Sequence, residues 1–163
     1  MLRLRRISET YHMLIHLLFG LSAFGLSLSL FPHQSVPVSI SLSLMASLVP
    51  DLDHFLFYFT YGSKTDYARR VKGYLKKGQF GQYVAFCKAN HKNNTTILSH
   101  NIGFYIISLL LSAVFFSFGH LYLGTFFLSW SYHYMFDMCE DMLFFGRLNP
   151  NWLFQFNRQR LPL

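Results

Sequence analysis

Long apolar blocks that alternate with short basic blocks constrain this chain more than any other feature of its sequence. A membrane-spanning helix needs about 20 mostly apolar residues, and such stretches lie at residues 11–31, 37–58, 102–118 and 121–138. Hydrophobic residues make up 52% of the chain and charged residues only 13%, against about 25% charged residues in a typical soluble domain. We therefore predict an all-α, polytopic membrane protein, a four-helix transmembrane bundle that forms a single membrane domain over residues 1–163.

The positions of the basic residues predict how this bundle is oriented. Four spans would place the N-terminus, the central loop at 60–100 and the C-terminal tail on one side of the membrane. All 14 Lys and Arg residues fall in these three segments, and none falls in the two short turns between spans. The positive-inside rule makes that side cytoplasmic. We expect an integral protein of a bacterial inner (cytoplasmic) membrane, with both termini in the cytoplasm.

The central loop is basic but carries a helical pattern. Apolar and aromatic side chains recur there at helical spacing between basic residues: Tyr67, Val71, Tyr74 and Leu75. The pattern predicts a short helix on the membrane surface, ending near Gly78 and Gly81, although a solvated linker with some helix fits equally well. Because anionic lipid headgroups attract basic segments, we expect membrane lipids as partners, and not nucleic acid, despite the net charge of +7. The tail, with Trp152, is predicted at the interface.

Ionisable side chains within membrane helices are costly and are therefore candidates for function. The direction of each predicted span places its ionisable groups near the cytoplasmic side. The first span contributes one such residue, the second two, the start of the third one and the end of the fourth two: His16, Asp51, His54, His100, His133 and Asp137. All four helices therefore bring potential metal ligands to one depth on one side.

The spacing of these residues favours a metal site. His133 and Asp137 are four residues apart and Asp51 and His54 are three apart, so each pair shares one helix face. Imidazole and carboxylate together suit zinc, manganese or iron more than calcium. We predict that the six residues bind one or two divalent ions, with zinc favoured. Asp53 points elsewhere and is the candidate catalytic base, a ligand of a second ion or an acceptor that orients a histidine.

A few other groups have an open role. Four of them lie near the predicted site in sequence: His12, His91, Glu140 and Asp141. His12 and His91 are possible extra ligands. The two acids either supply a general base or lie in solvent beyond the end of the fourth helix. His33 and His120 fall on the opposite side of the membrane, away from the site.

The order of these motifs resembles that of the YdjM-like membrane-bound metal-dependent hydrolases. The matching segments are His16-Leu-Leu-Phe-Gly20, Pro50-Asp51-Leu52-Asp53-His54, Ser99-His100-Asn101 and His133-Tyr-Met-Phe-Asp137. The second segment is the most specific, and the four together span nearly the whole chain. The resemblance implies a metal-dependent hydrolase and leaves its substrate open.

We therefore expect a hydrolase that acts at the cytoplasmic face on a lipid or other membrane-associated phosphoester, because the site lies at headgroup depth. A bound metal would lower the pKa of a water toward about 7. One alternative is a transporter of divalent metal or protons, which usually has polar groups near the membrane midplane; the third span has no such ionisable group. The other is a non-catalytic membrane protein whose polar cluster holds the helices together.

Overall fold

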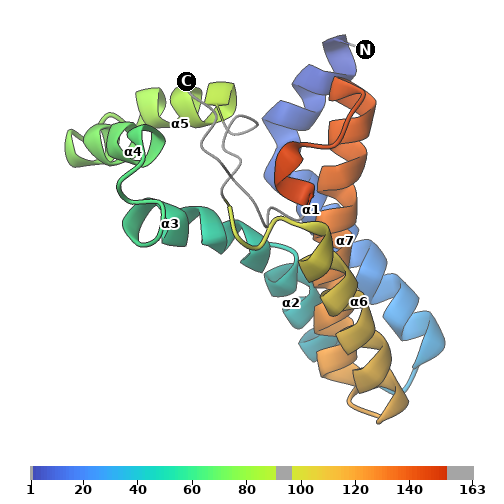
Figure 1. The fold of residues 1–163 in the computed structure, drawn as a ribbon. Helices are drawn as coiled ribbons and strands as arrows, with labels where there is room; N and C mark the ends of the chain where they lie inside the picture. Colours follow the sequence, from blue (N-terminus) through green and yellow to red (C-terminus); the bar gives the residue numbers. More distant parts are fainter. Residues whose placement is uncertain (1, 91–96, 154–163) are drawn as a thin grey trace.

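The computed structural model describes residues 2–90 and 97–153, and this part of the chain is entirely helical. The all-α prediction is confirmed. Figure 1 shows an elongated bundle from which a shorter arm branches. The bundle consists of α1 (Leu2–Leu30), α2 (Val36–Ala46), α6 (Ile102–Ser117) and α7 (Leu121–Phe145), and the arm of α3 (Leu52–Phe59), α4 (Asp66–Lys76) and α5 (Phe80–Asn90). Two 3₁₀ turns, η1 (Val49–Asp51) and η3 (Pro150–Trp152), lie beside the site.

The central helix of the bundle is α7, which packs against α1, α2 and α6 (Figure 1). A tight turn at Gly119, with φ of 76°, joins α6 to α7, and the predicted antiparallel hairpin forms. Glycines and serines line the helix contacts. The Ser43 hydroxyl donates to the Gly20 carbonyl at 2.7 Å, and the Ser129 hydroxyl donates to the Ser43 carbonyl at 2.6 Å. These small side chains let the backbones approach closely, as in membrane helix pairs.

The outward face of the bundle is apolar. Many large hydrophobic side chains there are exposed, among them Leu14, Leu18, Leu26, Ile107 and Leu110. By length and composition, two described helices could cross a membrane, Arg3–Leu30 and Val36–Phe59, and Ile102–Ser117 is a shorter apolar helix. The helix α7 is long enough, but its serines, His133 and three acids lower its mean hydropathy.

Three predicted helix boundaries were wrong. The first helix starts at Leu2 instead of residue 11, because its basic first turns continue the helix across a kink at Tyr11. The second is not continuous over 37–58, because Pro50 has no N–H to donate and the chain forms η1 between α2 and α3. The last continues past residue 138 to Phe145, where Gly146 in the left-handed conformation ends it.

The arm forms the helices expected in the central loop. An apolar core joins α3, α4 and the segment that precedes α6. Its buried members are Phe57, Tyr58, Ala68, Val71 and Ile97. The helix α4 ends before Gly78, as predicted, whereas Gly81 lies within α5 and does not break a helix. Trp152 was expected at the membrane interface but is only 3% exposed, because it packs against the candidate site.

Candidate metal centre

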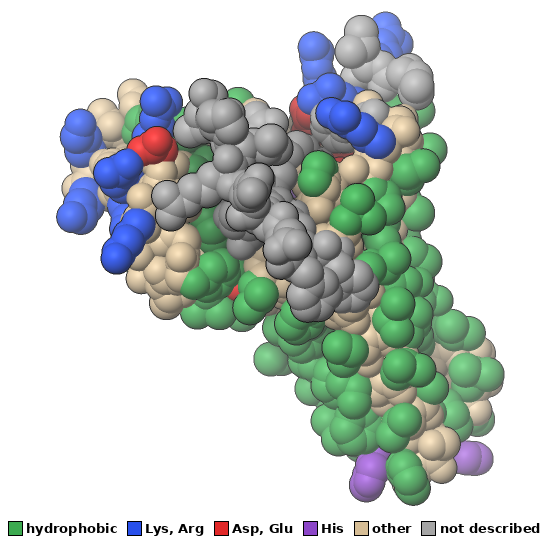
Figure 2. Space-filling model, in the orientation of Figure 1, with side chains coloured by type: hydrophobic (Ala, Val, Ile, Leu, Met, Phe, Trp, Pro, Cys, Tyr) green, Lys and Arg blue, Asp and Glu red, His purple; other side chains and the backbone are tan. Residues whose placement is uncertain are grey.

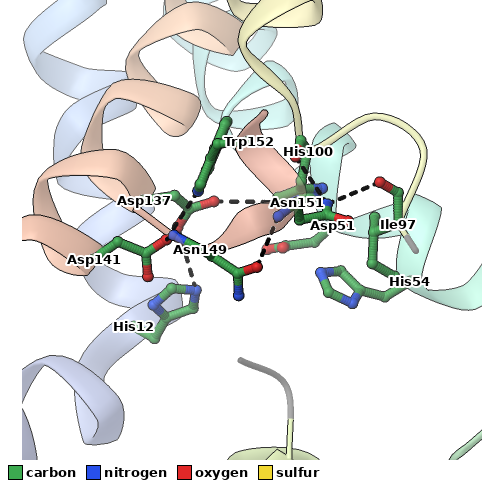
Figure 3. A pocket seen from close by; sticks show the side chains of 10 residues that line it. All are labelled: His12, Asp51, His54, Ile97, His100, Asp137, Asp141, Asn149, Asn151 and Trp152. Carbon is green, nitrogen blue, oxygen red and sulfur yellow. Dashed lines mark hydrogen bonds and ion pairs between the residues drawn. The ribbon is translucent and has the colours of Figure 1, made fainter. Parts of the chain in front are cut away.

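The side chains predicted as metal ligands lie together at the junction of the bundle and the arm. A cavity of about 70 Å³ lies among them, and Figure 3 shows the residues that line it. Four of the six predicted ligands line it, together with His12: Asp51, His54, His100 and Asp137. His16 and His133 lie behind these residues and are fully buried. Four helical elements, α1, η1, α3 and α7, and the segment before α6 thus contribute to one cluster, which we call the metal centre.

Asp137 of α7 stands in the middle of the cluster. Its Oδ1 faces the histidines of α1, at 3.4 Å from His16 Nε2 and 3.9 Å from His12 Nε2. Its Oδ2 faces the other side, at 3.3 Å from His133 Nε2 and 3.5 Å from His100 Nε2. Both carboxylate oxygens therefore have two histidine nitrogens as neighbours.

A break in the second helix orients His133. In a continuous helix, the amide of Asp51 would donate to the carbonyl of Ser47. Around Pro50 that amide instead donates to Leu48, at 3.2 Å. The Ser47 carbonyl lies 2.7 Å from His133 Nδ1, which donates to it. The proton on Nδ1 leaves Nε2 with a free electron pair, and a backbone acceptor of this kind typically orients a metal-binding histidine.

The buried Nε2 of His133 has no hydrogen-bond partner among the described residues. It lies 3.3 Å from Asp137 Oδ2 and 3.8 Å from Asp51 Oδ1. A buried polar atom of this kind is costly unless something satisfies it. A metal ion placed among these atoms would do so.

The other edge of the centre is formed by Asp51, His54 and His100, one ligand atom of each lying within 4.8 Å of the other two. The rings of His54 and His100 are 5.0 Å apart. Burial lowers the pKa of His100 to about 3, and the neighbouring His54 lowers it as well. His100 is therefore neutral at pH 7, which is the form of imidazole that binds a metal.

The distances within the centre fit a metal. Around a tetrahedral zinc with bonds of about 2.0–2.1 Å, the ligand atoms lie about 3.3 Å apart. In this structure the nitrogens of His12 and His16 are 3.0 Å apart, and the contacts of Asp137 with histidine range from 3.3 to 3.9 Å. Four groups of three residues are close enough to hold an ion: His12–His16–Asp137, His16–Asp51–His133, Asp51–His54–His100 and His100–His133–Asp137.

The predicted catalytic residue, Asp53, is not a member of these groups. Its Oδ1 accepts a hydrogen bond from the Tyr61 hydroxyl at 2.8 Å, and its Oδ2 accepts one from the Ser99 amide at 2.7 Å. Both carboxylate oxygens are thus used to hold the backbone next to His100. Asp53 thus positions His100 through the backbone. A catalytic base would instead face the cavity, which Asp53 does not line.

The residues after α7 complete the centre, and no pattern in the sequence predicted this role for them. Asn151 donates from its side chain to the carbonyls of Ile97 and His100, at 2.9 and 2.8 Å. Trp152 Nε1 donates to Asp141 Oδ2 at 2.9 Å. These contacts hold the segment that carries His100 against α7 (Figure 3). No helical period or ligand motif marks Asn151, so only the folded chain reveals it.

Four sequence interpretations were open, and the structure bears on three of them. His12 lines the cavity, next to His16 and Asp137. Glu140 and Asp141 are 4% and 2% exposed, so the alternative that they lie in solvent was wrong. Glu140 accepts a hydrogen bond from Ser8, and His12 Nδ1 lies 3.7 Å from Glu140 Oε1. His91 lies outside the described residues.

Comparisons with known proteins identify no relative. No family model matches the chain, and neither the curated proteins nor the solved structures contain a match. The resemblance to the YdjM-like hydrolases therefore rests on the four sequence motifs alone.

Proposed function

We propose that this protein is a membrane-bound, metal-dependent hydrolase of the YdjM-like type, with its site at the cytoplasmic face of a bacterial inner membrane. The chain crosses the membrane through α1, the segment Val36–Phe59, α6 and α7. The substrate is a lipid or other membrane-associated phosphoester, and zinc is the preferred ion.

The distribution of charge supports the orientation. Figure 2 shows Lys and Arg side chains gathered over α4 and the beginning of α1, whereas hydrophobic side chains cover the far part of the bundle. The metal centre lies toward the basic end. Positive charge marks the cytoplasmic side of membrane proteins, and basic arms beside a membrane attract anionic headgroups. A substrate with a phosphate group would meet the same positive potential on its way to the centre.

One observation carries the catalytic part of the proposal. Five histidines and two aspartates converge on one small cavity, and a fully buried imidazole nitrogen there, His133 Nε2, lacks a hydrogen bond. Polar clusters that only join helices have partners for their buried atoms. Elsewhere in the bundle, buried serine hydroxyls have such partners: Ser43 donates to the Gly20 carbonyl and Ser112 to the Gly124 carbonyl. The metal centre differs from these contacts in its imidazole and carboxylate side chains, and in the missing hydrogen bond of His133 Nε2.

The chemistry of the centre follows from its donors. A divalent ion held there supplies Lewis acidity and makes a water nucleophilic near neutral pH. In hydrolysis the water oxygen bonds to phosphorus, the ester P–O bond breaks, and the leaving oxygen takes up a proton. Glu140 and His12 stand at the α1 side of the centre, 3.7 Å apart. The Glu140 carboxylate would hold the proton that the attacking water loses.

The packing of the bundle favours an enzyme over a transporter. An ion path would need polar groups from the centre toward the opposite face. The buried polar side chains there, among them Gln34, Ser43 and Ser129, are neutral and already bonded to one another or to backbone carbonyls, so they offer no charged ligands to a divalent ion. Transport of divalent ions is therefore the outcome that a test must separate from hydrolysis.

A single preparation tests the proposal. The full-length protein, purified in detergent and incubated with Zn²⁺, is desalted and analysed for bound metal, and then assayed for release of phosphate or alcohol from vesicles of anionic phospholipid. We expect stoichiometric zinc and hydrolysis that a chelator abolishes. The Asp137→Asn variant should lose both. A protein that retains no zinc, or that carries zinc across proteoliposomes without hydrolysing any phosphoester, contradicts the proposal.

A further inference from the structure

We propose that the metal centre holds two divalent ions, with the carboxylate of Asp137 shared between them. This inference rests on the proposed function and refines it, because a site with two ions defines the kind of ester that the protein can cleave. It is drawn from the number, positions and directions of the ligand atoms.

The number of ligands exceeds what one ion takes. Zinc in proteins binds four ligands, and in catalytic sites three protein side chains and a water. The centre offers seven side chains, five imidazoles and two carboxylates: His12, His16, Asp51, His54, His100, His133 and Asp137. One zinc would leave at least three buried or half-buried ionisable groups without a role, which is costly in so small a space. Two ions use all seven side chains, which supply eight metal–ligand bonds when Asp137 is shared.

Two of the four groups of three ligands share no residue, and the other two groups, which both contain His133, connect them. His12, His16 and Asp137 form one group of three, and Asp51, His54 and His100 form another. In Figure 3 His12 and His54 stand on opposite sides of the cavity, with Asp51 and Asp137 between them. The two groups come from different elements, the first from α1 and α7 and the second from η1, α3 and the residue pair before α6.

The two oxygens of Asp137 point to different sets. Oδ1 faces His16 and His12, at 3.4 and 3.9 Å. Oδ2 faces His100 and His133, at 3.5 and 3.3 Å. A carboxylate whose oxygens face separate groups of nitrogen ligands is placed to bridge two ions. His133 completes the second set, since its Nε2 also lies 3.8 Å from Asp51 Oδ1.

A pair of ions selects the substrate by its chemistry. Two ions about 3.5–4 Å apart stabilise both the attacking and the leaving oxygen in an in-line displacement, as occurs at the phosphorus of a phosphoester. The negative oxygens of a phosphate group match two positive ions better than a neutral carboxylic ester would. We therefore assign a phosphomonoester or phosphodiester to the centre.

The stoichiometry of bound metal tests this inference. The full-length protein is loaded with Zn²⁺ in detergent, desalted, and its zinc content measured by mass spectrometry against protein from amino-acid analysis. Two zinc ions per chain are expected. One zinc ion overturns the shared centre and leaves the proposed hydrolase intact, whereas no zinc overturns the proposed function itself. This measurement uses the wild-type protein, so its outcome does not depend on whether a variant folds.

Variants then locate each ion. His16→Ala should remove the ion on the α1 side and His54→Ala the ion on the α3 side, so each variant should retain one zinc. His120→Ala, an exposed histidine at the turn before α7, is the matched control and should retain two. If His16→Ala and His54→Ala remove the same ion, a variant with both substitutions will still hold one zinc ion. The assignment of these ligands to two different ions is then wrong.

A spectroscopic readout tests the bridge separately. The protein loaded with Mn²⁺ should give an electron paramagnetic resonance spectrum of two exchange-coupled ions, because a shared carboxylate transmits the coupling. The Asp137→Asn variant should lose the coupling together with at least one ion. Two ions with the spectra of isolated Mn²⁺ would refute the sharing of Asp137.

Discussion

The bundle and the arm bury opposite kinds of side chain. In the bundle, helix contacts are made by serine, threonine and glycine, and large hydrophobic side chains such as Leu18 and Leu110 are exposed. In the arm, Phe57, Tyr58 and Val71 are buried, and the Lys and Arg side chains lie outside (Figure 2). One chain thus follows two opposite rules of burial over a short distance.

The difference agrees with the proposed placement of the bundle in lipid. In water, burial of apolar surface is the main driving force of folding, and the core beneath α4 follows this rule, whereas Leu52, Phe55 and Phe59 of α3 are exposed. In lipid, an apolar side chain gains little free energy by leaving the surrounding lipid tails, so helices associate through close packing and hydrogen bonds. The bundle follows this second rule. The metal centre lies where the two regions meet, which suits an enzyme that takes a charged headgroup from a lipid surface.

The largest expected effect comes from enlarging a residue inside the bundle. A Cβ on Gly20 would lie 2.9 Å from Ser47 Oγ and 3.1 Å from the Ser43 carbonyl. Gly20→Leu must therefore push α1 away from α2, and we expect no monodisperse protein in detergent by size-exclusion chromatography. Gly25→Leu, on the same helix with nothing within 4 Å of its added Cβ, should behave as wild type. Equal behaviour of the two variants would contradict close packing of α1 on α2.

The second-largest effect is expected from a charge placed on an exposed side chain, which should affect the bundle and the arm differently. Leu110 of α6 is 60% exposed and Val84 of α5 is 46% exposed, so neither is needed for the core. If only the bundle lies in lipid, Leu110→Lys costs about 2.5–3.5 kcal/mol near the membrane centre, whereas Val84→Lys changes stability by about 0.5 kcal/mol or less. Membrane insertion efficiency of the two variants in microsomes or vesicles measures the difference. Similar insertion would mean that the bundle does not lie in lipid.

A cavity in the arm should have a moderate and local effect. Val71 is fully buried in the arm core, and Val71→Ala removes two methyl groups, for a cost of about 2 kcal/mol. We expect faster proteolysis within α4 and α5 while the zinc content stays at the wild-type value, because Val71 does not line the cavity. Loss of zinc together with the arm would show that the two regions fold as one unit.

The smallest effect is expected at the start of α4. The Thr65 side chain accepts a hydrogen bond from the Ala68 amide at 3.2 Å and caps the helix. Thr65→Ala should cost about 1 kcal/mol, seen as faster hydrogen exchange of the α4 amides, and Thr65→Ser should restore the wild-type rate. Unchanged exchange in the alanine variant would show that the core alone holds α4.

The sequence was most informative where one physical rule acts along the chain. Apolar runs predicted the helical regions, and the spacing of His133 and Asp137 predicted a shared face. Helix ends were less accurate, because helices such as α1 continue into polar residues that hydropathy does not count. The division of the second helix depended on Pro50, whose effect on the Ser47 carbonyl appears only when His133 lies beside it.

The rest of the centre depends on contacts between distant segments. Asn151 bonds to Ile97 and His100, which precede it by 54 and 51 residues. Nothing in the local sequence around Asn151 or Trp152 distinguishes them from an interfacial tail. Asp53 was recognised as special, but its partners Tyr61 and Ser99 were not. Patterns along the chain identify ligand types, whereas the hydrogen bonds that orient them arise from the fold.

The central position of Asp137 has a consequence for the assembly of the protein in the cell. Its carboxylate joins ligands from α1 to those from α3 and the segment before α6, yet it belongs to α7, which the ribosome makes after all of them. For the proposed metal centre, the helices that emerge first would therefore keep their imidazoles unligated until α7 is made. Metal uptake would then be the last step of assembly, and a chain truncated before α7 would lack the central ligand.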